Sequence, residues 1–289
     1  MKQTSGEKIF QVFNYLFLAL ASATMLFPLL NLLAVSLSSP IAADSKQVFL
    51  FPVEFTTASW ERIFQNMGLW TSFGVTIYIT VLGTFLSMLF SVVMAYPLSR
   101  KEFLLRKPIM FGIIVTMIFN APMIPFFLVI REMGMMNSLW ALILPGLIST
   151  FNMIIIRTFF MGIPGELDDS ARMDGCTDAG ILFRIYLPLS KPVMATVSLF
   201  YAVGYWNTFQ RAVLFIRDPD KWPLQMKLRA YLTSPEELAS ASLLAGDYDF
   251  NTTTLKAATI LFATVPIILV YPYLQKYFVK GTMLGSLKE

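Results

Sequence analysis

The sequence predicts an all-α protein whose helices cross a membrane. Hydrophobic residues make up 56 % of its 289 residues, charged residues only 14 %, and the mean hydropathy is +0.64. A helix needs about 20 consecutive apolar residues to cross a bilayer, and six stretches of the chain meet that length. We find no internal repeat and no low-complexity segment, so residues 1–289 are predicted to form a single transmembrane domain.

Each predicted span is an apolar run between charged segments. The six runs cover approximately residues 10–37, 71–98, 108–130, 138–160, 193–213 and 257–278. The first run is too long for a signal peptide and is weakly flanked by a small-residue cleavage site, so we count it as a retained span. In the third run, Pro122 and Pro125 free backbone carbonyls and favour a pore-lining kink at Asn120.

Lysine and arginine residues indicate how the spans are oriented. With the N-terminus inside, the cytoplasmic segments carry most of the 22 Lys and Arg residues, although the outer segments are longer. The positive-inside rule then places both termini and the loop of residues 161–192 in the cytoplasm. This bias accounts for the net charge of +4, so the charge does not indicate a nucleic-acid partner.

A polar and charged segment interrupts the apolar pattern at residues 164–188. Pro164 suits the first turn of a helix. Glu166, Asp168 and Asp169 place negative charge near a helix N-terminus, where the helix dipole is positive. The segment is therefore predicted to begin with a short helix.

The second half of this segment contains the signals for a bend and another helix. Gly175 can take the left-handed conformation that ends a helix, and Thr177 or Asp178 can cap the next one. Pro188 and Pro192 are predicted to interrupt that second helix before the following apolar run. The periodicity of apolar residues alone favours a simple amphipathic connector between two spans. The spacing of particular residues indicates a more specific element.

That spacing resembles the loop by which permeases of ABC importers bind their ATPase. The family pattern is a Glu-Ala-Ala triplet, three residues, Gly, nine residues, Ile, one residue and Leu-Pro. Here Asp169-Ser170-Ala171 stands for the triplet, with Asp and Ser in place of Glu and the first Ala, and the remaining spacing is kept. By this resemblance, the residues that couple the chain to an ATPase are Glu166, Asp169, Ser170, Ala171, Asp174, Gly175, Ile185, Leu187 and Pro188.

Further segments resemble the carbohydrate branch of this family, in particular permeases for maltose-type and alginate-type oligosaccharides. They are Trp206-Asn207, Trp222-Pro223-Leu224, Pro266, and the tail that runs from Gln275 to Lys288. Glu289 replaces the usual final Gly. The resemblance implies the six-span type I importer fold with cytoplasmic coupling helices, in the inner membrane of a bacterial cell.

The same resemblance implies the partners. They are a second permease, identical or homologous, against which the first span lies, two ABC ATPase subunits and an extracytoplasmic solute-binding protein. ATP and Mg²⁺ are expected on the ATPase subunits, because this chain has no P-loop sequence of its own. We predict a transport subunit with no catalytic, cofactor-binding or metal-binding residues.

Missing residue types narrow the choice of function. The sequence has no His, and Cys176 is its only Cys, which excludes a structural disulfide and a His-containing catalytic triad. No ionisable residue lies in the middle of a predicted span, whereas proton-driven carriers usually keep one there. We read Cys176 as a small buried residue rather than a reactive thiol.

Sugar sites use aromatic faces and neutral hydrogen-bonding groups, and six residues of the third and fifth spans have these properties. The substrate-path candidates are Asn120, Tyr201, Tyr205, Trp206, Asn207 and Gln210. Packing between helices would use the same residue types and is an equally good explanation. The outer segment of residues 211–254 is basic in its first half, which suits an acidic sugar or simply a solvated face.

We therefore predict the permease subunit of an ATP-driven importer for oligosaccharides, with acidic, alginate-like ones as an option. Three alternatives stay open. The first is a permease of the same superfamily for peptides, amino acids or ions. The second is a sodium-coupled secondary carrier, which would transport without an ATPase. The third, a polytopic membrane enzyme, would need convergent acids, His or metal ligands near the spans, and none is visible.

Overall fold

The computed structural model describes residues 4–119, 121–233 and 251–285. Within these ranges the chain forms α-helices with short 3₁₀ and π turns and no strand, which confirms the all-α prediction. The chain divides into two compact units. The first comprises Met1–Met67 and Leu228–Val265, and the second comprises Gly68–Lys227 and Pro266–Glu289.

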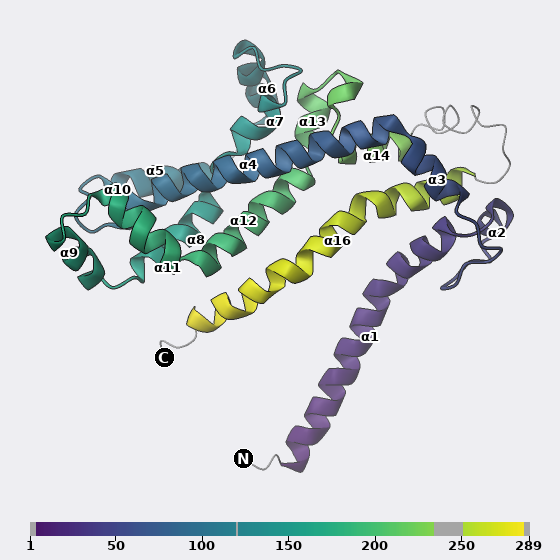
Figure 1. Cartoon of the computed structure of the whole chain (residues 1–289), viewed down its shortest axis with the longest axis horizontal. Helices are drawn as coiled ribbons and strands as arrows, with labels where there is room; N and C mark the ends of the chain where they lie inside the picture. The colour runs from purple at the N-terminus through teal and green to yellow at the C-terminus, as the bar shows by residue number, and fades with distance from the viewer. Residues whose placement is uncertain (1–3, 120, 234–250, 286–289) are drawn as a thin grey trace. The chain divides into compact units, whose positions relative to one another are not determined.

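The first unit begins with α1 (Ser5–Ser36), the long purple helix of Figure 1. Thr4 caps it, since its side chain accepts a hydrogen bond from the Glu7 backbone while the Glu7 side chain accepts one from the Thr4 backbone. The most apolar part of α1 has no buried residue. A helix that is apolar all round and uncovered by its own chain requires lipid or another protein around it.

Two short helices, α2 (Pro40–Asp44) and α3 (Ala58–Gln65), pack on the first turns of α16 (Thr252–Gly285). The hydroxyls of Ser59 and Thr254 are 2.8 Å apart, and the rings of Phe64 and Phe262 meet edge to face. Asn66 donates a hydrogen bond of 2.8 Å to the Tyr231 hydroxyl on α14 (Leu224–Thr233). These contacts join the two chain segments of the first unit.

The second unit is built around α4 (Met67–Ser99) and α12 (Lys191–Trp206), which run side by side in Figure 1. Hydroxyl pairs cross between them, Ser87 with Tyr205 at 2.9 Å and Ser91 with Tyr201 at 2.6 Å. Gly83 permits this approach, because a Cβ atom there would lie 2.8 Å from the Tyr205 ring. Close packing through small and hydroxyl residues is typical of helices in membranes.

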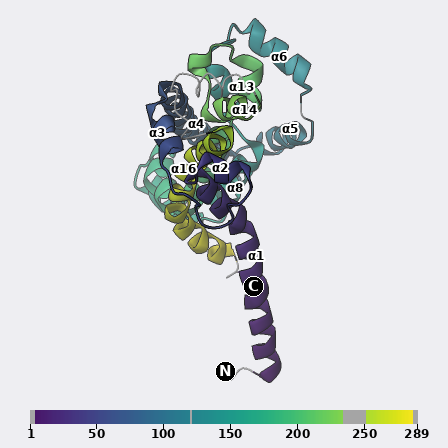
Figure 2. The same cartoon turned by 90° about the vertical axis from the view of Figure 1, so that its right-hand side faces the viewer.

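Three of the predicted spans were expected to be continuous helices, and the structure divides each of them into shorter helices. The run at 108–130 divides into α5 (Arg106–Ile118) and α6 (Met123–Glu132), which Figure 2 shows as separate helices. The run at 138–160 divides into α7 (Trp140–Ile143) with η1 (Leu144–Gly146), followed after a bend of 45° by α8 (Thr150–Met161). The run at 193–213 divides into α12 and α13 (Gln210–Phe215).

Proline and polar side chains explain these breaks. Pro122 restricts the backbone of the residue before it and stands directly before α6. Ser149 caps α8 by accepting a hydrogen bond from the Asn152 backbone. The Asn207 side chain donates to the Val203 carbonyl at 2.9 Å, where α12 ends. Asn120, the predicted kink, lies outside the described residues.

Among the described residues, three helical segments have the length and composition of a membrane span: Gly6–Ser36, Met67–Ser99 and Thr252–Val270. The two divided pairs, α5 with α6 and α7 to α8, bring the number to five if each pair is one span. Since α12 has 16 residues, it is shorter than the roughly 20 residues of a straight span. The count of six spans therefore stays a prediction.

Candidate functional site

The loop of residues 161–192 forms the predicted helix, bend and second helix. The first helix is α9 (Glu166–Met173), with three acidic residues in its first turn. Gly175 has a φ of +79°, the left-handed conformation that favours glycine. Thr177 then caps α10 (Asp178–Ile181) by accepting a hydrogen bond from the Gly180 backbone.

The structure corrects one of the proline predictions in this loop and locates the other. Pro164 precedes α9 instead of lying in its first turn, because Gly165 is the residue before the helix. The second helix continues past Pro188 through η2 (Leu182–Tyr186) and α11 (Leu187–Leu189) and ends there. The predicted interruption before the following apolar run therefore falls at Ser190, between Pro188 and Pro192, and Pro192 lies in the first turn of α12. The π turn of η2 is wider than an α-helical turn, which makes room for the Pro188 ring.

The predicted coupling residues differ in exposure. Glu166, Asp169, Ser170, Asp174, Gly175 and Pro188 are exposed, Ile185 and Leu187 are partly buried, and Ala171 is buried. Met173 at the end of α9 is 88 % exposed, so this helix presents an apolar side chain beside its acidic ones. Cys176 is partly buried against the core of the second unit. A helix with this surface is suited to bind another protein.

The acidic residue of α9 that is buried is Asp168. Its Oδ2 atom forms an ion pair with Nη1 of Arg100, just beyond the end of α4, and accepts a hydrogen bond of 3.0 Å from the Tyr186 hydroxyl. Burial raises the pKa of Tyr186, which keeps its hydroxyl protonated as a donor. The Arg100 guanidinium lies 4.6 Å from the ring centroid of Tyr96 and 4.7 Å from that of Tyr186.

We call Arg100, Asp168, Tyr96 and Tyr186 the anchor of α9. Phe160 of α8 closes it with an edge-to-face contact to Tyr186 at 5.3 Å. An ion pair that is sheltered by aromatic rings is screened little by water, so it holds α9 firmly to the end of α4. Sequence reasoning missed this role of Asp168 and Arg100. One signal was available in the sequence. Asp168 lies three residues before Ala171, so the two share one face of α9, and that face is the buried one.

The substrate-path candidates take different positions. Tyr201 and Tyr205 are buried, and both bond to groups on other helices. The Tyr201 hydroxyl accepts a hydrogen bond of 2.9 Å from the Ser149 backbone, and the Tyr205 hydroxyl donates one of 3.2 Å to the Ile143 carbonyl. These two tyrosines therefore connect helices, as the packing interpretation expects.

The remaining described candidates lie around the break after α12. Trp206 is buried against the Phe73 ring at 6.0 Å, in an edge-to-face contact. Asn207 and Gln210 are exposed, and the Asn207 amide oxygen is 3.5 Å from the amide nitrogen of Gln225. The structure thus leaves two neutral hydrogen-bonding side chains exposed at this break.

The outer segment of residues 211–254 is described only up to Thr233 and from Asn251. It contains α13, η3 (Pro219–Lys221) and α14. Lys221 forms an ion pair of 3.4 Å with Asp218, and the Lys227 ammonium lies over the Trp222 ring at 5.4 Å. These two basic residues therefore already have partners within the chain.

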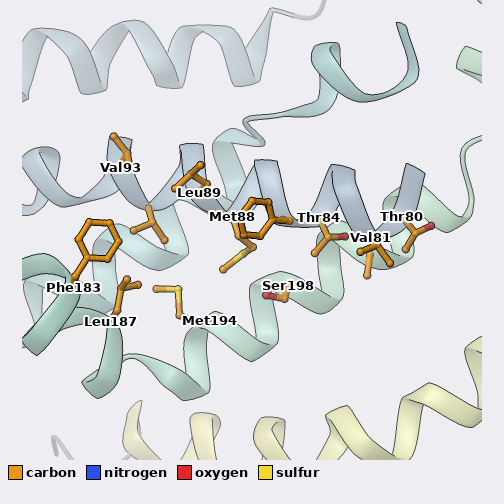
Figure 3. Close-up of a pocket in the computed structure, with 13 residues that line it drawn as sticks. Thr80, Val81, Thr84, Met88, Leu89, Val93, Phe183, Leu187, Met194 and Ser198 are labelled. Carbon is orange, nitrogen blue, oxygen red and sulfur yellow. The ribbon is translucent and has the colours of Figure 1, made fainter. Parts of the chain in front are cut away.

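An apolar groove of about 610 Å³ runs between α4 and α12 and reaches Phe183 and Leu187 of the loop at 161–192, the predicted coupling loop. Figure 3 shows its side chains, with the hydroxyls of Thr80 and Thr84 along α4. Neither hydroxyl has a hydrogen-bond partner within the described part of the chain, although both are buried. The groove is therefore an apolar surface with two unpaired hydroxyls among the described residues.

Comparison with known proteins identifies the family. Residues 87–283 match the family of binding-protein-dependent transport system inner membrane components. The polygalacturonan/rhamnogalacturonan transport system permease protein YtcP of Bacillus subtilis is 42 % identical, over 98 % of this chain and 99 % of its own length. The arabinooligosaccharides transport system permease protein AraQ of Halalkalibacterium halodurans is 31 % identical, over 91 % of each chain.

A solved structure agrees with these relatives. A chain of a bacterial ABC transporter involved in the import of the acidic polysaccharide alginate superposes with a TM-score of 0.90 at 34 % identity. The match covers 96 % of this chain and 99 % of that one. The type I permease fold expected from the spacing at 169–188 is therefore confirmed. The chain belongs to the inner membrane components of binding-protein-dependent transport systems, the permeases of ABC importers.

Proposed function

We propose that this chain forms the translocation path of an ATP-driven importer that takes up oligosaccharides delivered by a solute-binding protein. The observation that carries the proposal is α9, an exposed acidic helix that the anchor attaches to the end of α4. An ATPase that binds the exposed face of α9 can move α4 through this attachment. The two hydroxyl pairs between α4 and α12 pass the movement on to the fifth predicted span.

Coupling in this proposal is a rigid-body movement between two states of one assembly. Two ATPase subunits bind ATP and Mg²⁺, and their closure supplies the difference in free energy between the states. This chain contributes the loop at 161–192 as the mechanical contact, and no ATP site of its own. The exposed carboxylates of Glu166, Asp169 and Asp174 suit a basic surface on the ATPase.

The proposed substrate class follows the relatives. YtcP is described as a permease for polygalacturonan and rhamnogalacturonan, and the solved relative as part of an importer of acidic alginate. Both descriptions name polymers with acidic sugar units. We therefore favour acidic oligosaccharides as the substrate. Neutral oligosaccharides are the alternative within the same class, because the relative AraQ belongs to a transport system for arabinooligosaccharides.

The proposed assembly contains a second permease. The uncovered apolar surface of α1 supports this, because an apolar helix without contacts in its own chain is available to pack against a partner. The termini and the loop at 161–192 lie in the cytoplasm, as the positive-inside bias favours. Cysteine labelling tests this orientation in a Cys176→Ala background. Lys101→Cys should react only from inside and Asp220→Cys only from outside.

The decisive experiment is uptake by the whole assembly. The chain is purified with its co-eluting partners, which are identified, and reconstituted in liposomes with ATP inside and the binding protein with a labelled oligosaccharide outside. Uptake should require both ATP and the binding protein. Uptake by the chain alone, driven by a sodium gradient, would instead establish a secondary carrier. Uptake of peptides or amino acids but no sugar would refute the substrate class.

A further inference from the structure

Arg211 lies where two interrupted helices meet. It is the second residue of α13, after the break that follows α12. Its Nη1 atom donates a hydrogen bond of 2.9 Å to the carbonyl of Leu142 in α7, the helix that ends before the 45° bend into α8. Helices that break inside a transporter expose backbone groups, and such breaks are a recurrent position for binding sites.

Among the described residues, the groups that hold the Arg211 guanidinium are uncharged. Its central carbon lies 5.9 Å from the Tyr205 ring, and the Tyr205 hydroxyl is fixed by its bonds to Ser87 and to the Ile143 carbonyl. Gly146 provides the space, because a Cβ atom there would lie only 2.6 Å from Nη1. Carbonyl oxygens and a ring face attract a cation, but they leave its full charge in place.

No carboxylate in the part of the chain that the structure describes neutralises this charge. Within residues 4–119, 121–233 and 251–285, Arg211 forms one hydrogen bond and no ion pair. A guanidinium has five N–H donors, so most of them are available to a ligand. Arg211 is partly buried, and a charge withdrawn from water without a counter-ion is costly to keep, which makes such a residue a candidate functional site.

We propose that Arg211 binds the carboxylate of an acidic sugar unit as the oligosaccharide passes the break between α12 and α13. The proposal rests on the oligosaccharide function proposed above and deepens it. A planar guanidinium matches a carboxylate with two parallel hydrogen bonds. Because the described groups that hold Arg211 are neutral, the anion meets no competing carboxylate among them. Asn207 and Gln210, both exposed at the same break, supply hydrogen bonds to sugar hydroxyls.

The test compares two substrates that differ only in charge. The reconstituted assembly is given a galacturonic acid trimer or the same trimer with its carboxylates methyl-esterified. Arg211→Gln should raise the half-saturation concentration for the charged trimer roughly 10-fold or more, as expected for losing a charged hydrogen bond. The value for the ester should stay the same. Arg211→Lys should restore part of the loss, because it keeps the charge without the planar geometry.

Two further variants separate binding from structure. Arg131→Gln removes an exposed arginine of α6, and it should leave both trimers unaffected. Gly146→Ala keeps the charge of Arg211 but displaces its guanidinium, and it should weaken uptake of the charged trimer more than uptake of the ester. Yield of the assembled complex and its melting temperature are recorded for every variant.

The outcomes discriminate between the proposals. An equal loss for both trimers, or no loss for the charged trimer in Arg211→Gln, overturns the role of Arg211 and leaves the importer function intact. If the wild type does not take up the ester, the role of Arg211 is tested with the charged trimer alone, by comparing Arg211→Gln with Arg211→Lys. A loss that Arg211→Lys partly restores supports the proposal, and equal losses in both variants overturn it. If the wild-type assembly takes up neither trimer, the result contradicts both the acidic substrate class and the proposed role of Arg211.

Discussion

Two arginines of the second unit have opposite surroundings. Arg100 is paired with Asp168, flanked by Tyr96 and Tyr186, and almost fully withdrawn from water. Arg211 is held by one carbonyl and one ring, without a carboxylate among the described residues. A cation with a resident partner fixes two chain segments to each other, whereas a cation without one is available to a ligand. The first arrangement suits transmission of force and the second suits recognition.

The largest effect is expected when the Arg100 pair is broken. Asp168→Ala leaves a buried guanidinium without its counter-ion, which typically destabilises a protein by about 3–5 kcal/mol. The melting temperature of the assembly should fall clearly. The matched control is Asp178→Ala, which removes the exposed ion pair to Arg172 and should cost about 0–1 kcal/mol. Equal effects of the two variants would show that the anchor is not a special contact.

A smaller loss is expected from Tyr186→Phe. The ring stays against Arg100 and Phe160, while the hydrogen bond to Asp168 is lost. A hydrogen bond to a charged group contributes about 1.5–3 kcal/mol, so unfolding free energy should fall by that order. Tyr15→Phe in the exposed part of α1 serves as the control and should have no effect. A stability unchanged by Tyr186→Phe would mean that Asp168 is sufficiently held by Arg100.

Gly175→Val tests the bend between the two helices of the coupling loop. A φ of +79° is unfavourable for residues with a side chain, by roughly 1–2 kcal/mol and more for a β-branched one. The variant should assemble poorly with the ATPase or hydrolyse ATP without transport. Gly165→Val is the control, since Gly165 has a φ of −66°. Normal uptake with normal ATP hydrolysis in Gly175→Val would refute the need for this bend.

The smallest effect concerns the neutral groups near Arg211. Asn207→Ala removes one exposed amide, and loss of a neutral hydrogen bond costs about 1 kcal/mol, or roughly fivefold in affinity. Half-saturation for the sugar should rise, while the melting temperature should fall only slightly, because the bond from Asn207 to the Val203 carbonyl is exposed. The opposite result, a clearly lower melting temperature with unchanged half-saturation, would assign Asn207 to helix packing and remove it from the substrate path.

The sequence was sufficient to predict the local features of the coupling loop. Gly175 as the bend and Thr177 as a cap follow from short-range conformational preferences, and the structure has both. The π turn before Pro188 was not predicted, because it is a tertiary adjustment that single-sequence signals do not contain. The helix ends at Ile118 and Trp206 lie within apolar runs, and a hydropathy average over a whole run does not detect them.

Long-range partners were beyond sequence reasoning. Arg100 and Asp168 are 68 positions apart, and each had a sufficient local explanation, one as a cytoplasmic charge and the other as an acid near a helix N-terminus. Tyr201 and Tyr205 looked equally suited to a sugar path and to packing, and only their hydroxyl contacts place them between helices. Arg211 was recognised as basic, but that it has no counter-ion among the described residues depends on the fold.

The central claim is that the anchor transmits the movement of α9 to α4, and the number of sugars taken up per ATP hydrolysed measures it most directly. Asp168→Asn keeps the shape and a hydrogen-bonding partner for Tyr186 but removes the charge that holds Arg100. Assemblies that contain this variant and elute intact should keep hydrolysing ATP, with a transport ratio lowered on the order of tenfold, which corresponds to about 1.4 kcal/mol of lost coupling. A ratio equal to that of the wild type would contradict the claim.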